Sequence, residues 1–385
     1  MKAVELFAGI GGFRVACDSL GLRTVWANDN APQAVAVYRS RFLGAALHEG
    51  NLERLLDSIP PHDVLTGGFP CQPFSAAGKK RGIEDPRGTL FQLIVDVVRE
   101  KKPHVFVLEN VKRLLTMDAG KHFATILDAL AGLDYAIEWR LLNAMNLGLP
   151  QNRQRVLIVG VRGGREAGGL RVRLARKSEL AEADGYRHAL LCASSSWMDI
   201  TAHGAKFPSW GVALGGRFYG ADLDRFADSV PLVPLKDVLL APAKVGPEFD
   251  FTDSTIERLK SSASVQKFIG GVEILSNQGG GARMGYTVFG VNGVAPTLTC
   301  AQSRHYERYK IGDRYRRLTN TEYARIQGFD DEHCSVVSPF AQYALFGNAI
   351  PPPMARWALQ RALSEGELLT RAEPLNRQAE LFSHA

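Results

Sequence analysis

The sequence predicts a doubly wound α/β domain joined to a smaller domain made mostly of β-strands and loops. Three observations predict this fold class. Short apolar runs alternate with helical segments from residue 4 to residue 162. A glycine-rich turn joins the first predicted strand to the first predicted helix. Beyond residue 162 the alternation stops, and a glycine-rich sequence with short β-like runs follows from about residue 234.

The composition argues against a disordered chain, a disulfide-rich secreted protein and a membrane-spanning protein. The 385 residues are 45% hydrophobic and 22% charged, which is typical of a chain with a sizeable core. The net charge of +6 and the pI of about 9.0 are compatible with a phosphate-rich partner. The five cysteines form neither a disulfide framework nor a zinc pattern, which indicates a reducing, cytoplasmic setting. No apolar run approaches the roughly 20 residues that a membrane span requires.

The glycine turn follows the first predicted strand (residues 4–7) and precedes a helix predicted over residues 13–20. This arrangement is the entry to a nucleotide-binding α/β unit. Gly9 and Gly11 allow the tight turn, but the third glycine expected at position 14 is Arg14. The departure argues against a bound pyrophosphate and leaves open a ligand without phosphates.

Asp29 follows the second predicted strand (residues 24–27) and lies about 20 residues after Gly9. An acid at this spacing commonly accepts hydrogen bonds from ribose hydroxyls. The same residue could instead cap the helix that begins at Pro32, and the two roles are compatible. A short strand is predicted over residues 45–47, shortly before Asn51.

A single cysteine, Cys71, follows the apolar run of residues 64–66 and a turn with two glycines and a proline. Such a turn forces a sharp backbone path that presents a thiol to a pocket. Most unpaired cysteines are small buried hydrophobes, so this stretch by itself leaves both roles open. The chain continues to residue 88 as a long, basic, glycine-rich loop, which indicates either a mobile lid that meets phosphates or a solvated surface.

Glu109 follows the continuous apolar run of residues 105–108, which is typical of a central parallel strand. Gly9, Asp29, Cys71 and Glu109 thus follow four predicted strands at their carboxyl ends. In open α/β sheets that edge is where ligands bind. The sequence therefore predicts a site there.

Two arginines precede the last predicted strand of this half, residues 156–160. If the segment is extended, Arg153 and Arg155 lie on one face, and two forked guanidinium groups suit recognition of an anion or a carbonyl. Ordinary surface arginines are the alternative. Farther along, the loops at residues 277–283 and 301–306 carry the polar side chains that read base edges, although such residues are also common in other loops.

Six stretches, in this order, resemble motifs of the DNA (cytosine-5) methyltransferase family. They are Phe7-Ala8-Gly9-Ile10-Gly11-Gly12, Gly68-Phe69-Pro70-Cys71-Gln72, Glu109-Asn110-Val111, Gln151-Asn152-Arg153-Gln154-Arg155, a helix at 316–329, and Gly347-Asn348-Ala349-Ile350-Pro351. The resemblance spans residues 1–162 and about 290–355, and it is closest to the bacterial modification-enzyme type.

The resemblance implies a methyltransferase (Rossmann-like) fold that uses S-adenosylmethionine and no metal. It implies that Cys71 is the nucleophile and that Glu109, Arg153 and Arg155 complete the catalytic set. The residues implied for the cofactor are Phe7, Gly9, Gly11, Asp29, Asn30, Asn51, Leu52, Pro70, Leu90, Asn348 and Ala349. Asn51 stands where many members have an acid, and Asn30 replaces a frequent aromatic residue, so we expect altered cofactor affinity.

The implied partner is double-stranded DNA, from which the target cytosine must be flipped because its C5 atom is inaccessible inside a duplex. The residues expected to contact DNA are Gln72, Ser75, Lys79, Lys80, Arg81, Arg283, Thr297, Gln302, Ser303 and Arg304. A methyltransferase of tRNA cytosine-5 and a non-catalytic DNA-binding relative are the alternatives.

The expected organisation has three parts. Residues 1–162 and 340–385 form the cofactor-binding and catalytic domain, residues 163–233 are an insertion of unknown role, and residues 234–339 hold the target-recognition domain and the return to the catalytic domain. The final helix, predicted from Met354, is expected beside the first strand. We expect a cytoplasmic, nucleoid-associated monomer without membrane contact. It would act alone or in a restriction-modification system, with a cognate restriction endonuclease that acts on the same site.

Overall fold

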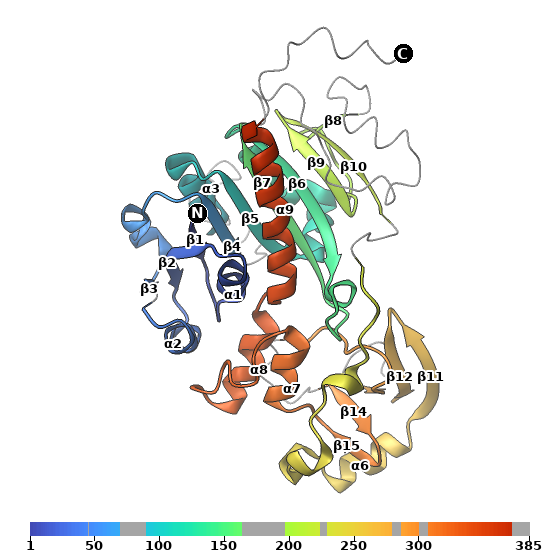
Figure 1. The fold of residues 1–385 in the computed structure, drawn as a ribbon. Coiled ribbons are helices and arrows are strands. Elements are labelled where there is room, and N and C mark those ends of the chain that lie inside the picture. Colours follow the sequence, from blue (N-terminus) through green and yellow to red (C-terminus); the bar gives the residue numbers. More distant parts are fainter. Residues whose placement is uncertain are drawn as a thin grey trace, which may run out of the picture.

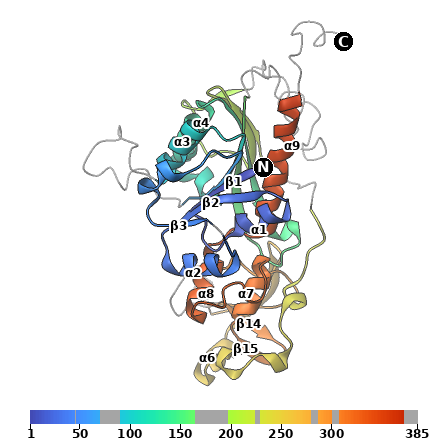
Figure 2. The ribbon, with the colours of Figure 1, turned by 60° about the vertical axis from the view of Figure 1, so that its left-hand side comes forward.

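Figure 1 shows the fold of the computed structural model, which describes residues 1–44, 46–69, 90–163, 197–223, 229–278, 286–299 and 307–371. A large sheet occupies one end of the molecule and a small sheet the other. Helices α7 (Asn320–Gln327) and α8 (Pro339–Asn348) lie between them in both ribbon views (Figures 1 and 2). No helix of the described part is long and apolar enough to cross a membrane.

The large sheet has ten strands within the described residues. Their spatial order is β3 (Leu47–Glu49), β2 (Arg23–Asp29), β1 (Lys2–Leu6), β4 (Val64–Gly68), β5 (Val105–Val111), β7 (Gln154–Arg162), β6 (Tyr135–Asn143), β9 (Trp210–Leu214), β10 (Arg217–Ala221) and β8 (Met198–Asp199). The strands from β3 to β5 pair in parallel, whereas β7 runs antiparallel to both of its neighbours. Strand β1 pairs with β2 on one side and β4 on the other, so the order reverses there and leaves a crevice at the carboxyl ends.

Helices cover both faces of this sheet, as Figure 2 shows. Helices α3 (Leu90–Lys101) and α4 (Lys121–Ala131) pack on one face, and α1 (Gly12–Ser19) and α9 (Pro352–Arg371) pack on the other. Alternation along β5 divides its apolar run accordingly. Phe106 and Leu108 belong to the core under α3 and α4, and Val105 and Val107 to the core under α1 and α9. The predicted doubly wound fold is confirmed.

Several boundaries differ from the predictions, and three of the differences bear on the site and the final helix. Strand β5 continues to Val111, so Glu109 lies within a strand instead of following it. Helix α7 begins at Asn320, because Thr319 and Glu322 form a capping box and Arg316 ends strand β15 (Arg314–Arg316). The final helix begins at Pro352 and packs mainly against α1, β5 and β7, where β1 was expected as its neighbour. Ala3 of β1 still belongs to the same buried cluster.

Residues 197–223, most of the described part of the expected insertion, are not separate from the large sheet. Their strands β9, β10 and β8 extend the sheet beyond β6. Gly211 and Gly220 interrupt the apolar pattern there because a side chain at Gly211 would lie about 2.2 Å from the Trp139 ring. The close approach explains why the sequence shows no clear strand period in this segment.

The small sheet has the order β11 (Ala263–Ile269), β12 (Val272–Asn277), β13 (Thr287–Phe289), β14 (Arg308–Ile311) and β15. Its buried side chains Val272, Phe289 and Tyr309 share a core with Tyr323 of α7 and Phe346 of α8. The other described helices are α2 (Pro32–Arg41), which follows β2, and α6 (Asp253–Lys260), which precedes β11. Helices α7 and α8 therefore attach the small sheet to the large one.

Candidate active site

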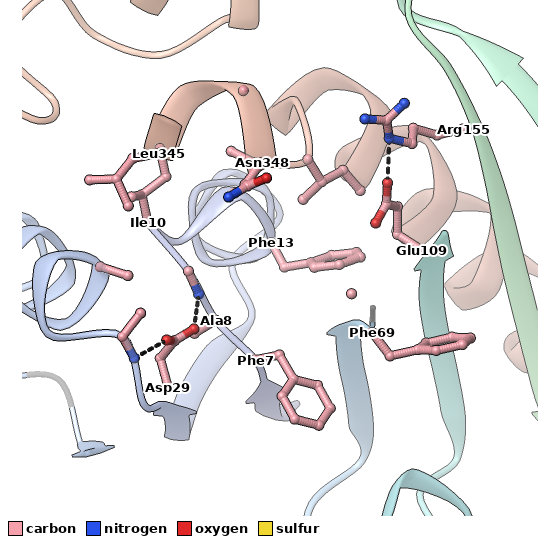
Figure 3. A pocket seen from close by; sticks show the side chains of 18 of the residues that line it. Phe7, Ala8, Ile10, Phe13, Asp29, Phe69, Glu109, Arg155, Leu345 and Asn348 are labelled. Atoms are coloured by element: carbon pink, nitrogen blue, oxygen red, sulfur yellow. Dashed lines mark hydrogen bonds and ion pairs between the residues drawn. The ribbon is translucent and has the colours of Figure 1, made fainter. Parts of the chain in front are cut away.

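A cavity of about 440 Å³ opens at the carboxyl ends of β1, β4 and β5, where the strand order reverses. Figure 3 shows it from close by. Its lining comes from six parts of the chain: Phe7, Ala8, Gly9, Ile10, Gly12 and Phe13; Asp29, Ala31 and Ala34; Gly68 and Phe69; Glu109, Asn110 and Val111; Arg155; and Leu345, Gly347, Asn348, Ala349 and Ile350. The strand-end edge that the sequence singled out therefore surrounds one cavity.

The glycine turn forms one wall. Gly9 and Gly11 have positive φ angles of 55° and 84°, which glycine adopts without strain. Gly12 begins α1 next to the backbone of Ile350, whose carbonyl oxygen would lie 2.3 Å from a β-carbon at that position. Glycine at position 12 thus allows the first turn of the fold to meet the turn after α8.

Asp29 holds the glycine turn in place. Its Oδ2 accepts a hydrogen bond from the backbone N–H of Gly9 at 2.7 Å, and its Oδ1 accepts one from Ala31 at 2.8 Å (Figure 3). The N-cap residue of α2 is Ala31, so Asp29 is not the capping residue that the sequence left as an alternative. Each carboxylate oxygen keeps a lone pair for a further donor, and the residue lines the cavity.

Glu109 and Arg155 form an ion pair at the opposite wall, with 2.8 Å between Arg155 Nε and Glu109 Oε1 (Figure 3). The pair joins neighbouring strands β5 and β7, and its side chains are only 14% and 12% exposed. Burial raises the pKa of Glu109 above its ordinary value, although the positive charges of Arg155 and Arg153 oppose the shift. A carboxyl group with a raised pKa is suited to holding and delivering a proton.

Arg153 does not lie beside Arg155 in the cavity lining. Its side chain is fully buried, and its guanidinium group donates to the carbonyl oxygens of Leu298, Gly347 and Ala349 at distances of 3.1, 2.9 and 2.9 Å. The predicted shared face is absent because residue 153 precedes β7, which begins at Gln154. The contacts of Arg153 are those of a residue that holds backbone in place.

Asn110 positions the start of the loop that carries the candidate nucleophile. Its buried side chain donates to the carbonyl oxygen of Phe69 at 3.0 Å and accepts from the N–H of Val111. Cys71 itself lies outside the described residues. So do Pro70, Gln72, Ser75, Lys79, Lys80, Arg81, Arg283, Gln302, Ser303 and Arg304.

The implied cofactor residues divide into two groups. The cavity is lined by Phe7, Gly9, Asp29, Asn348 and Ala349, and it is not lined by Gly11, Asn30, Asn51, Leu52 or Leu90. The oxygen of Asn51 accepts a hydrogen bond from the N–H of Glu53 at 3.3 Å. The cofactor-binding roles of both groups stay predictions.

Thr297, an expected DNA contact, donates its hydroxyl to the carbonyl oxygen of Asn152 at 2.5 Å. Sequence reasoning missed His333, whose Nε2 lies 2.8 Å from the carbonyl oxygen of Ile10 and supports the glycine turn from the small-domain side. It also missed the apolar wall formed by Phe13, Leu345 and Ile350. No local pattern marks these residues, because their partners are distant in sequence.

The sequence profile of the family described as C-5 cytosine-specific DNA methylase matches residues 1–363. The Type II methyltransferase M.HhaI of Haemophilus parahaemolyticus is 28% identical over 355 residues, covering 91% of this chain and 90% of the relative. Type II methyltransferase M1.ScrFI of Lactococcus lactis subsp. cremoris is 46% identical over 161 residues, or 41% of each chain. M.NgoBI of Neisseria gonorrhoeae is 44% identical over 160 residues, which is half of its own length. The chain thus matches half or less of the length of M1.ScrFI and M.NgoBI.

Two solved structures have the same fold. A DNMT2 mutant of Spodoptera frugiperda has a TM-score of 0.62 with 16% identity, covering 94% of this chain and 99% of that one. A putative DNA modification methyltransferase from an Escherichia coli prophage has a TM-score of 0.57 with 18% identity and covers 94% of this chain. The profile match over nearly the whole chain decides the family. The chain belongs to the C-5 cytosine-specific DNA methylase family.

Proposed function

We propose that the protein is a site-specific DNA (cytosine-5) methyltransferase that transfers a methyl group from S-adenosylmethionine to C5 of a flipped-out cytosine in duplex DNA. The observation that carries the proposal is the buried Glu109–Arg155 pair, which faces the same cavity as the glycine turn and the start of the Cys71 loop. One cavity thereby combines Glu109 as a proton donor, Arg155 as a fixed positive charge and the glycine turn as a binding surface for a small molecule.

The lining fits S-adenosylmethionine as the methyl donor. Apolar side chains of Phe7, Ile10 and Phe13 suit an adenine ring, and the Asp29 carboxylate suits the two ribose hydroxyls. Arg14, in place of the third glycine of a dinucleotide turn, is compatible with a ligand that lacks a pyrophosphate. When bound there, this group supplies an electrophilic methyl group.

The residues of the chain then have separate tasks. The thiolate of Cys71 adds to C6 of the cytosine, which gives C5 the nucleophilic character of an enamine. Glu109 in its protonated form donates to N3 and stabilises the adduct, and Arg155 donates to the base carbonyl while it holds Glu109. C5 then takes the methyl group, and its proton leaves to solvent water. Elimination of the Cys71 sulfur as a thiolate, with return of the N3 proton to Glu109, restores the aromatic base.

The DNA is proposed to bind between the catalytic and target-recognition domains. Thr297 and the loops at 277–283 and 301–306 would read the sequence, and the basic loop after Cys71 would close over the phosphates. The division into residues 1–162 with 340–385 and residues 234–339 is part of the same proposal. A cytoplasmic monomer, nucleoid association and a cognate endonuclease belong with it.

Bisulfite sequencing of plasmid DNA from cells that express the protein tests the activity. We expect methylcytosine at one short recurring sequence with the wild-type chain and with Cys334→Ser, a buried thiol outside the cavity lining. The Cys71→Ser variant should leave the plasmid unmethylated. An unmethylated plasmid with folded wild-type protein and available cofactor would refute the duplex-DNA substrate. The tRNA of the same cells would then be analysed as the alternative substrate.

A further inference from the structure

Two buried side chains hold both peptide groups of a single residue, Leu298. The N–H of Leu298 donates to Gln151 Oε1 at 3.1 Å, and its carbonyl oxygen accepts from Arg153 Nη1 at 3.1 Å. Gln151 and Arg153 are each 0% exposed, and Leu298 is 1% exposed. The peptide groups of Leu298 therefore keep their hydrogen bonds only if Gln151 and Arg153 stay in place.

The same two side chains also connect to the carboxyl end of α8, Arg153 directly and Gln151 through Gln327. Gln151 Nε2 donates to Gln327 Oε1 at 2.9 Å, and Gln327 in turn donates to the carbonyl oxygen of Phe346. Arg153 Nη2 donates to the carbonyl oxygens of Gly347 and Ala349. Two independent hydrogen-bonded connections thus run from residue 298 to residues 346–349.

The two connected segments belong to different parts of the proposed site. Residues 347–349 line the cofactor cavity. Residues 295–298 belong to the small-domain side, where Ala295 pairs with Gln151 in a parallel bridge and Thr297 is an expected DNA contact. Residues 295–298, which would contact DNA, and residues 347–349, which would contact the cofactor, are therefore both hydrogen-bonded to the network of Gln151 and Arg153.

Resting on the proposed function, we propose that Gln151 and Arg153 are positioning residues that couple DNA binding to cofactor binding. Neither side chain lines the cavity. Because both connections are buried, a displacement of residues 295–298 on DNA must either move residues 347–349 or break hydrogen bonds inside the protein. Linkage is reciprocal, so a ligand that orders one segment improves the affinity for the other ligand by the same factor.

The test is the ratio of two dissociation constants for S-adenosylhomocysteine, measured by calorimetry without and with a duplex that carries the sequence found on the plasmid. For the wild-type chain we expect the duplex to tighten binding by roughly 5- to 150-fold, the usual range of coupling between sites. Arg153→Lys offers a single ammonium group in place of the forked guanidinium group. In this variant the two dissociation constants should differ by no more than about threefold.

Gln151→Met keeps the length of the side chain and removes its hydrogen bonds to Leu298, Gln327 and the carbonyl oxygen of Ile326. It provides a second variant if Arg153→Lys does not fold. Arg162→Lys is the matched control. Arg162 ends the same strand β7 and donates to the carbonyl oxygen of Lys102, far from both segments. The ratio of this control should equal that of the wild-type chain.

A ratio near one in the wild-type chain overturns the coupling whatever the variants do. Folded variants that keep the wild-type ratio also overturn it, even if they bind each ligand more weakly. A wild-type chain that binds no duplex and methylates no plasmid refutes the proposed function instead.

Discussion

The two sheets of this molecule place their residues in opposite environments. In the large sheet, residues 105–108 of β5 are fully buried between two layers of helices. In the small sheet, β11 is an edge strand, and its Phe268 and Ile269 side chains are 60% and 52% exposed. The groups of the candidate active site, Glu109 and Arg155, extend from strands of the first kind.

This difference distinguishes positions suited to catalysis from positions suited to recognition of a partner. A strand packed on both faces holds its side chains within a narrow range of positions, which reaction geometry requires. A sheet with an exposed edge leaves side chains accessible to a partner, and substitutions there cost little stability. The joint between the sheets, at residues 150–153 and 295–298, connects the two environments.

The largest expected effect comes from removing the part of the large domain that follows the small one. An isolated fragment of residues 1–162 lacks α9, whose buried Met354, Ala358 and Leu359 cover the face formed by β5 and β7. We expect no stable fold and no cofactor binding by calorimetry. Full binding by the fragment would show that the large sheet does not depend on the returning helix.

Glu109→Gln should lower kcat by about 10²- to 10⁴-fold, because the group that we propose to donate to N3 is lost. Single-turnover methylation measures the change, and Glu100→Gln on the exposed surface of α3 is the matched control. A variant with wild-type turnover would remove Glu109 from the mechanism.

The raised pKa of Glu109 predicts how kcat changes with pH. Because burial raises the pKa of Glu109, its proton is retained above the usual carboxyl range and is lost as the pH rises through the raised pKa. The wild-type kcat should therefore decline on the alkaline side of that pKa. The residual activity of Glu109→Gln should not show this alkaline decline.

The two sheets can be compared directly by matched truncations. Phe106→Ala removes a fully buried ring of β5 and should lower the free energy of unfolding by about 3–5 kcal/mol. Phe268→Ala on the exposed edge strand should change it by less than about 0.5 kcal/mol. Denaturant unfolding measures both, and similar losses would contradict the proposed difference between the sheets.

A further effect on stability depends on pH and concerns a buried acid in β1. Burial raises the pKa of Glu5 to about 8, opposed by the hydrogen bond from Tyr38 and the charge of Arg14. Between the ordinary carboxyl pKa and this value the unfolded chain has lost the proton that the folded chain keeps. Stability should therefore fall as the pH rises in this window, by up to about 1.4 kcal/mol per pH unit.

Glu5→Gln should remove most of that slope, whereas Glu257→Gln on the exposed side of α6 should leave it unchanged. Thermal unfolding from pH 5 to pH 8 follows the slope. Equal slopes in wild type and Glu5→Gln would show that Glu5 ionises inside the fold without cost.

Much of the fold could be predicted because its signals are local. Continuous apolar runs mark β4, β5 and β7, and Gly9 and Gly11 mark the turn whose positive φ angles require them. The strands β8–β10 could not be predicted, since their glycines serve close contacts with Trp139 and interrupt the period. The cavity brought Gly9, Asp29 and Glu109 together as expected, because carboxyl ends of parallel strands share one edge.

The succession of strands and helices over residues 1–162, the glycine turn and the motifs that mark the family could be predicted from the sequence, because each depends on neighbours along the chain. The different contacts of two nearby arginines arise only in the folded protein: Arg155 faces Glu109, whereas Arg153 turns inward to Leu298 and Gly347. Arg153 and Gly347 are separated by 194 residues. No local pattern records such a contact, since it exists only after the final helix has returned to the first half of the sheet.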